Sequence, residues 1–128
     1  MELTLPIIVS ILTLHWFCDF ILQTRKQAEN KSKSLLFLSV HVSNYFGGFV
    51  IVLLPFSYIT GRFSDQAIMT YCIANALAHW VTDFFTSRWT SYLWHKKDIH
   101  SFFAVIGFDQ LIHTTTLLTT AAYFNERM

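Results

Sequence analysis

Apolar residues fall into four long runs along the chain, and short polar segments separate the runs. The runs cover about residues 3–22, 35–56, 66–86 and 102–124. Each is close to the ~20 residues that an α-helix needs to cross ~30 Å of hydrocarbon. The pattern therefore predicts an all-α fold: a polytopic membrane protein in which residues 1–128 form a single domain, a bundle of four transmembrane helices. The first run lacks the basic start and the small-residue cleavage site of a signal peptide, so we expect it to be retained.

The composition agrees with a membrane location. Hydrophobic residues make up 53% of the 128 residues and charged residues only 13%, whereas a soluble domain carries about 25% charged residues. The formal net charge of +1 gives no reason to expect nucleic acid as a partner. Cys18 and Cys72 both lie inside apolar runs, where we expect buried thiols that form no disulfide.

The basic residues indicate an orientation. All nine Lys and Arg residues lie outside the four runs, and only Arg62 and Arg127 fall on the side of the termini. Short loops rich in Lys and Arg remain in the cytoplasm. Both termini are therefore predicted outside, and loops 23–34 and 87–101 in the cytoplasm. The basic residues of these two loops are Arg25, Lys26, Lys31, Lys33, Arg88, Lys96 and Lys97.

The connection between the third and fourth runs is rich in aromatic residues. From Arg88 to His100 it carries Trp89, Tyr92 and Trp94 close to two lysines. Amphipathic aromatics beside cations suit the headgroup layer of a membrane. We therefore expect a short interfacial segment between helices 3 and 4.

One motif occurs twice. His15-Trp16-x-x-Asp19-Phe20 and His79-Trp80-x-x-Asp83-Phe84 are two copies of H-W-x-x-D-F, 64 residues apart. With two helices in each half of the chain, the first and third helices run in the same direction, so both copies reach the same depth. This predicts an internal two-helix repeat about an axis along the membrane normal.

Seven ionisable side chains fall within the runs, where an isolated one costs at least ~2.5 kcal/mol. Spacings of i, i+4 place them on one face of each helix. At 1.5 Å per residue they lie roughly 5–15 Å from the cytoplasmic ends. Inward-facing polar stripes at one level predict a single site near the cytoplasmic face. Its expected members are His15, Asp19, His41, His79, Asp83, Asp109 and His113.

Imidazoles with carboxylates are common ligands of zinc, manganese or iron, and four-helix bundles bind metals in this way. All seven side chains are candidate ligands, of one divalent metal ion or of two that lie a few ångströms apart. Asp19, Asp83 and Asp109 are also the candidate catalytic carboxylates, because a bound metal makes hydroxide from water at neutral pH. A proton or ion relay is one alternative, and a metal-free network of His–Asp hydrogen bonds that locks the helices is another.

The residues also resemble a known family. The string His15-Trp16-x-x-Asp19-Phe20-x-x-Gln23-Thr24, followed by Ala28, Asn30-Lys31 and His41, is similar to the domain of unknown function 3307 family. The resemblance continues through His79-x-x-x-Asp83 and Asp109-Gln110-x-x-His113 and so covers nearly the whole chain. It implies a small bacterial or phage membrane protein, in the bacterial inner membrane or that of the phage's host. It also adds Gln23, Lys31 and Gln110 to the site, as residues that position a substrate.

A more distant likeness, resting on membrane-embedded His and Asp, is to membrane-bound metal-dependent hydrolases. The leading hypothesis is therefore a metal-dependent hydrolase of a lipid or a lipid-linked phosphoester, with membrane lipid as its partner. One alternative is a proton or metal-ion transporter or channel, although the outer half of the bundle offers little polar lining. The other is a structural or host-interacting phage or bacterial membrane protein without enzymatic activity.

Overall fold

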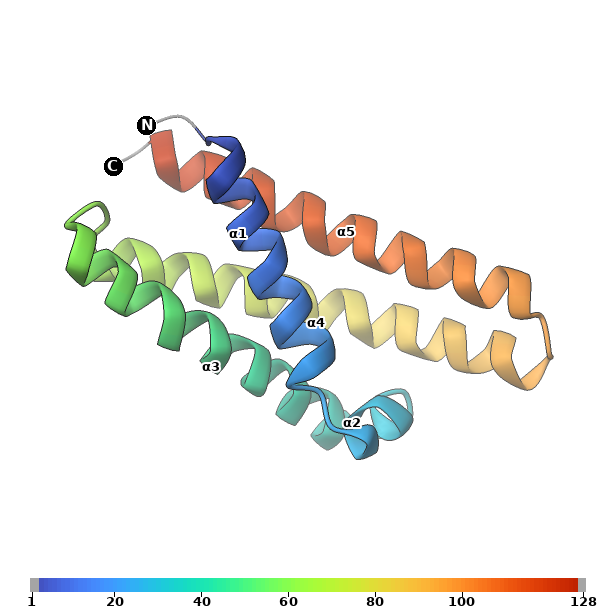
Figure 1. Ribbon diagram of the computed structural model, residues 1–128. Coiled ribbons are helices and arrows are strands. Elements are labelled where there is room, and N and C mark those ends of the chain that lie inside the picture. The colour runs from blue at the N-terminus through green and yellow to red at the C-terminus, as the bar shows by residue number, and fades with distance from the viewer. Residues whose placement is uncertain (1–2, 127–128) are drawn as a thin grey trace.

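The computed structural model describes residues 3–126, which are helical throughout apart from short connections and contain no strand. Three long antiparallel helices, α3, α4 and α5, pack with α4 between the other two, and α1 crosses them (Figure 1). The start of α1 lies at the same end of the molecule as the end of α5. The elements are α1 (Leu5–Trp16), the π-helix η1 (Phe17–Ile21), α2 (Arg25–Asn30), α3 (Leu35–Thr60), α4 (Asp65–His95) and α5 (Ile99–Glu126).

Local sequence explains where several helices begin and end. Thr24 and Gln27 form a capping box at the start of α2, each side chain bonding the other residue's backbone N–H. Ser64 caps α4 by accepting a hydrogen bond from the backbone N–H of Ala67. Gly61 ends α3 in the left-handed conformation, with φ of 62°, which a glycine adopts without steric cost.

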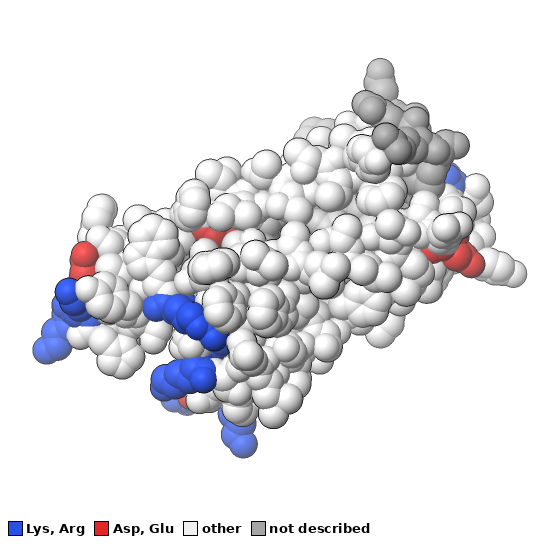
Figure 2. Space-filling model, turned by 180° about the vertical axis from the view of Figure 1, so that it is seen from behind, with Lys and Arg blue, Asp and Glu red and all other residues white. Residues whose placement is uncertain are grey.

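The long helix α4 has its polar face inside and its apolar face outside. Asn75, His79 and Asp83, spaced four residues apart, are all at least 97% buried. On the opposite side, Leu77 and Phe85 are each 65% exposed. A helix of a water-soluble domain normally has the reverse arrangement. The surface seen in Figure 2 is correspondingly uncharged over most of its middle, and its visible charged side chains lie mainly toward the two ends.

Residues 88–95 do not form a separate interfacial segment, so that prediction is wrong. They continue α4 to His95, and the connection to α5 is the tight turn at Lys96, Lys97 and Asp98. No glycine or proline interrupts this stretch, and the ring centroids of Trp94 and Phe102 lie 5.2 Å apart across the turn. The aromatic residues therefore belong to a helical hairpin.

The all-helical part of the prediction is confirmed, but the four membrane spans remain a prediction. Among residues 3–126, α3 is the one helix that is long and apolar enough to cross a membrane by length and composition. Residues Leu5–Ile21 form a shorter apolar helix. Arg127, which entered the orientation argument, lies outside the described residues.

Candidate metal centre

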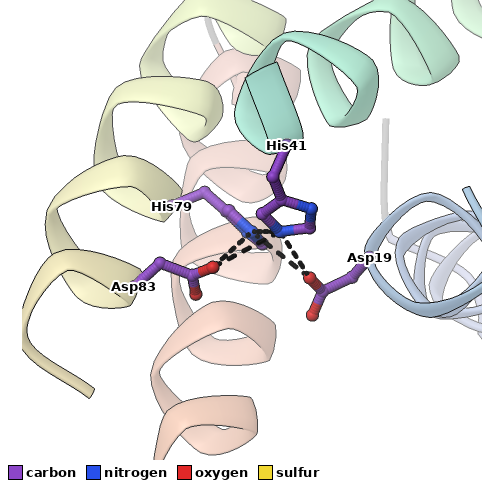
Figure 3. A group of neighbouring side chains, drawn as sticks. All are labelled: Asp19, His41, His79 and Asp83. Carbon is purple, nitrogen blue, oxygen red and sulfur yellow. Dashed lines mark hydrogen bonds and ion pairs between the residues drawn. The ribbon is translucent and has the colours of Figure 1, made fainter. Parts of the chain in front are cut away.

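Four buried side chains from three elements point toward one another, as Figure 3 shows. His41 comes from α3, His79 and Asp83 from α4, and Asp19 from η1. None of the four is more than 4% exposed. We call His41, His79, Asp19 and Asp83 the tetrad.

Asp19 reaches the tetrad from a π-helix. The backbone N–H of Leu22 bonds the carbonyl of Phe17, five residues earlier, at 3.0 Å. The wider turn buries the adjacent residues Cys18 and Asp19 together. Single π-helical turns within α-helices often occur at functional sites. Space for Cys18 comes from Gly48 of α3, where an added Cβ would lie 2.5 Å from its Sγ.

The donor atoms of the tetrad are spaced like the ligands of a small cation. The two Nε2 atoms of His41 and His79 are 3.1 Å apart. Asp19 Oδ1 lies 3.1 Å from the first and 3.3 Å from the second, and Asp83 Oδ2 lies 3.3 and 3.6 Å from them. For a tetrahedral metal with bonds of ~2.0–2.2 Å, the edges between ligands measure about 3.3–3.6 Å. The five distances, 3.1–3.6 Å, lie within or slightly below this range.

Hydrogen bonds alone do not account for this convergence. An imidazole Nε2 carries at most one proton, yet His41 Nε2 has three such neighbours within 3.3 Å. Two facing Nε2 atoms cannot both donate into the centre without their hydrogens colliding. A central cation would satisfy both nitrogens and both carboxylate oxygens at once, so the donor set fits a divalent metal.

The surroundings of the imidazoles depart from the usual pattern in one respect. Metal-bound histidines commonly donate their second ring N–H to a neighbour, whereas the Nδ1 atoms of His41 and His79 have no hydrogen-bond partner. Stacking fixes the His79 ring instead. It lies between the rings of Tyr45 and His113, with centroid distances of 4.2 and 4.1 Å.

A second group of donors adjoins the tetrad. Asp19, Asp109 and His113 each offer a ligand atom within 4.8 Å of the others. His113 Nε2 lies 3.1 Å from Asp83 Oδ1 and 3.4 Å from Asp109 Oδ2. Six of the seven predicted metal ligands therefore belong to these two groups, and their role as ligands stays a prediction.

His15, the seventh predicted ligand, lies one hydrogen bond away. Its Nε2 is 3.0 Å from Gln110 Oε1 and 3.9 Å from Asp19 Oδ2, and its Nδ1 is 3.3 Å from the Tyr45 hydroxyl. Gln110 in turn donates to Asp19 Oδ2 at 3.0 Å and to Asp109 Oδ2 at 3.1 Å. In this arrangement His15 orients the amide that joins two carboxylates.

A small pocket of about 160 Å³ lies beside both groups. The three residues predicted to position a substrate, Gln23, Lys31 and Gln110, all line it. Lys31 Nζ lies 2.8 Å from Asp83 Oδ2. Burial disfavours its charge, but Asp83 and Asp19 outweigh that effect and raise the pKa of Lys31. The other lining residues are Asp19, Phe20, Asp83, Thr86, Ser87, Thr90, Ile106 and Asp109.

The pocket also contains hydroxyl groups that are not among the predicted site residues. Thr86 Oγ1 donates to Asp109 Oδ1 at 2.5 Å. The Ser87 hydroxyl, in a side chain that is 8% exposed, has no hydrogen-bond partner. Ser87 continues the spacing of His79 and Asp83 by four residues, so its position was readable from the sequence. Thr86 lies off that row and was not.

Comparisons with known proteins give a family and no activity. No curated protein and no solved structure matches the chain. The family model described as "Protein of unknown function (DUF3307)" matches residues 7–127, nearly the whole length. The chain therefore belongs to the DUF3307 family.

Proposed function

We propose that this protein is a membrane-embedded metalloprotein that hydrolyses a phosphoester of a lipid or a lipid-linked substrate. The observation that carries the proposal is the spacing of the tetrad. The two imidazole nitrogens lie 3.1 Å apart, and each lies 3.1–3.6 Å from one oxygen of Asp19 and one of Asp83, in a buried cluster from three elements. Zinc, manganese and iron are the divalent ions that such a donor set favours.

The membrane location is supported by the distribution of side chains on α4 and α5. These helices contain polar residues such as Asn75, His79, Asp83 and His113, which lower their mean hydropathy although they face the interior. Their outward residues, among them Leu77, Phe85 and Leu111, are 60–65% exposed. At 1.5 Å per residue, α4 and α5 are about 40–47 Å long, enough to span a bilayer.

The site lies toward the basic end of the bundle. The pocket is lined by Lys31 and Thr90, and α2 and the turn between α4 and α5 occupy the same end of the molecule (Figure 1). Cytoplasmic loops carry the excess of Lys and Arg. This supports an inner-membrane protein whose pocket is reached from the cytoplasmic side, with both termini outside.

The chemistry needs a divalent cation, which supplies a Lewis acid and lowers the pKa of a bound water. The chain itself supplies the other functions. Asp109, at the pocket wall, can accept a proton from an attacking water, and the Lys31 ammonium can neutralise a phosphate oxygen. Gln23 Oε1, buried without a partner, can accept a hydrogen bond from a substrate hydroxyl. The pocket volume of about 160 Å³ suits a headgroup phosphate, with the lipid tails outside it.

Attack by water fits better than attack by a protein nucleophile. Cys18 and Cys72 are buried and do not line the pocket. Ser87 lines it, but its hydroxyl has no hydrogen-bond partner and therefore no adjacent base. An ion pathway is disfavoured by the buried hydrophobic cluster that includes Tyr45, Phe49 and Leu117, each at most 2% exposed.

The test is metal content and hydrolysis measured on the same preparation. The full chain is purified in mild detergent, its metals are quantified by mass spectrometry, and phosphate release from phospholipid vesicles is followed. We expect stoichiometric metal and activity that Asp83→Asn abolishes and that the exposed control Asp65→Asn preserves. A protein without stoichiometric metal would refute the proposal. Metal without hydrolysis, together with ion uptake by liposomes, would favour transport instead.

A further inference from the structure

Asp19 and Asp83 each direct their two carboxylate oxygens to different places. Asp19 Oδ1 faces the tetrad imidazoles at 3.1 and 3.3 Å, while its Oδ2 accepts from Gln110 at 3.0 Å. Asp83 Oδ2 faces the same imidazoles, while its Oδ1 lies 3.1 Å from His113 Nε2. Carboxylates that present one oxygen to each side are the usual bridges in sites with two metals a few ångströms apart.

We infer that the cluster holds two divalent cations, and that the second, bound by Asp19, Asp109 and His113, is the one that faces the substrate. This inference rests on the proposed function and adds that the first cation is structural while the second faces the substrate. The tetrad is the first centre, and Asp19 belongs to both groups.

The two centres differ in how completely the protein encloses them. The tetrad has four donors. The side chains of His41 and His79 are at most 1% exposed and do not line the pocket, and those of Asp19 and Asp83, which line it, are 5% and 2% exposed. Metal sites with four protein ligands and no open position are typically structural. The second centre has three donors. His113 does not line the pocket, whereas the Asp109 side chain, 15% exposed, does. Three protein ligands beside an open space are typical of catalytic metals.

The buried charges can also accommodate more than one divalent cation. Asp19, Asp83 and Asp109 face the pocket, and Lys31 is the one Lys or Arg side chain among its lining residues. With neutral imidazoles, the cluster keeps two uncompensated negative charges, which are expensive in an apolar interior. One divalent ion neutralises them, and a second makes the pocket positive. A positive pocket is what an anionic phosphate needs.

Binding of the second cation would change the hydrogen bonds of Gln110. Its Nε2 donates to Asp19 Oδ2 and Asp109 Oδ2 at 3.0 and 3.1 Å, and these carboxylates also belong to the second group. A cation there requires the amide to release at least one of these hydrogen bonds. Gln110 thus holds the two carboxylates in place when the second centre is empty.

Metal stoichiometry of the full-length protein in detergent decides the inference. The purified chain is loaded with manganese, desalted, and analysed for manganese per chain and by electron paramagnetic resonance. We expect two ions per chain and the multiline spectrum of a coupled pair. His113→Ala and Asp109→Asn should each keep one ion and show an uncoupled spectrum, and the exposed control His100→Ala should keep two. Circular dichroism confirms that each variant retains its helices.

The other outcomes separate this inference from the proposed function. One ion in the wild type, unaffected by His113→Ala but lost in His41→Ala, would overturn the second centre and leave the proposed metalloprotein intact. No bound ion would overturn both. If His113→Ala does not fold, the wild-type stoichiometry and the coupled spectrum still decide.

Discussion

The two copies of H-W-x-x-D-F occupy different backbones although their motif residues are identical. Residues 15–20 run from α1 into the π-helix η1, whereas residues 79–84 lie within the uninterrupted helix α4. Both copies deliver an aspartate to the tetrad, but only the second delivers its histidine there. A shared motif therefore fixes which side chains point inward, and the neighbouring helices decide what each one contacts.

The difference has its source in what packs against each copy. α3 brings Gly48 against Cys18 of the first copy, and this close approach accompanies the π-helical turn. His15 then meets Tyr45 and Gln110 instead of the tetrad. In the second copy, Asp83 forms an ion pair with Lys31. Asp19 has no lysine or arginine at a comparable distance among the described residues.

The largest expected effect separates the two aspartates. Asp83→Ala leaves Lys31 buried without its 2.8 Å partner, so we expect it to lower the free energy of unfolding by about 3 kcal/mol or more. Asp19→Ala should cost less, on the order of 1–3 kcal/mol, because it strands no cation. Chemical unfolding in detergent measures both. Adding Lys31→Met should recover stability in the Asp83→Ala background and not in the Asp19→Ala background. Equal recovery in both would contradict this assignment.

Removing the two histidines should affect metal binding unequally. His79→Ala deletes a tetrad donor, and we expect it to abolish stoichiometric binding. His15→Ala removes only a residue that acts through Gln110, and the loss of such outer contacts typically weakens metal affinity by about 10–100-fold. Titration against a chelator of known affinity distinguishes the two. Equal loss of metal in both variants would instead make His15 a direct ligand, as its position in the motif first indicated.

The sequence predicted those parts of the candidate site that follow from the spacing of residues along a helix. The spacing of His79, Asp83 and Ser87 by four residues placed them on one face, and each is at most 8% exposed. Helix α2 was missed, although Thr24 and Gln27 carry the capping-box pattern that marks its start.

Other features were beyond the sequence for a physical reason. The π-helical turn packs its Cys18 against Gly48, which is distant from Cys18 in the chain and meets it only after folding. The prediction of a separate interfacial segment was wrong because it rested on residue type alone. Trp89 and Trp94 are typical of a membrane interface, but their backbone continues helix α4. The aromatic composition of a segment indicates which environment its side chains prefer, but it does not indicate where a helix ends.

Two adjacent glycines of α3 probe the backbone of the first copy. In Gly48→Ala the new Cβ would lie 2.5 Å from Cys18 Sγ, so we expect a loss of about 1–3 kcal/mol in unfolding free energy from overpacking. Gly47→Ala is the matched control, because nothing lies within 4 Å of its Cβ, and it should gain about 0.5–1 kcal/mol. Thermal unfolding measures both changes, and maleimide labelling reports whether Cys18 becomes accessible. If both variants behave alike, the close approach does not shape this turn.

The smallest expected effect separates the two tryptophans of the motif. Trp80 Nε1 donates to Ser39 Oγ of α3 at 3.2 Å, whereas Trp16 is 53% exposed. Trp80→Phe therefore removes one hydrogen bond, worth about 0.5–1.5 kcal/mol, and Trp16→Phe should change unfolding by less than about 0.5 kcal/mol. Ser39→Ala should match the loss in Trp80→Phe and add nothing to it, because both remove the same bond. A larger loss in Trp16→Phe would mean that the first copy depends on its outward face, and that the two copies differ in what their tryptophans contact as well as in how they meet the tetrad.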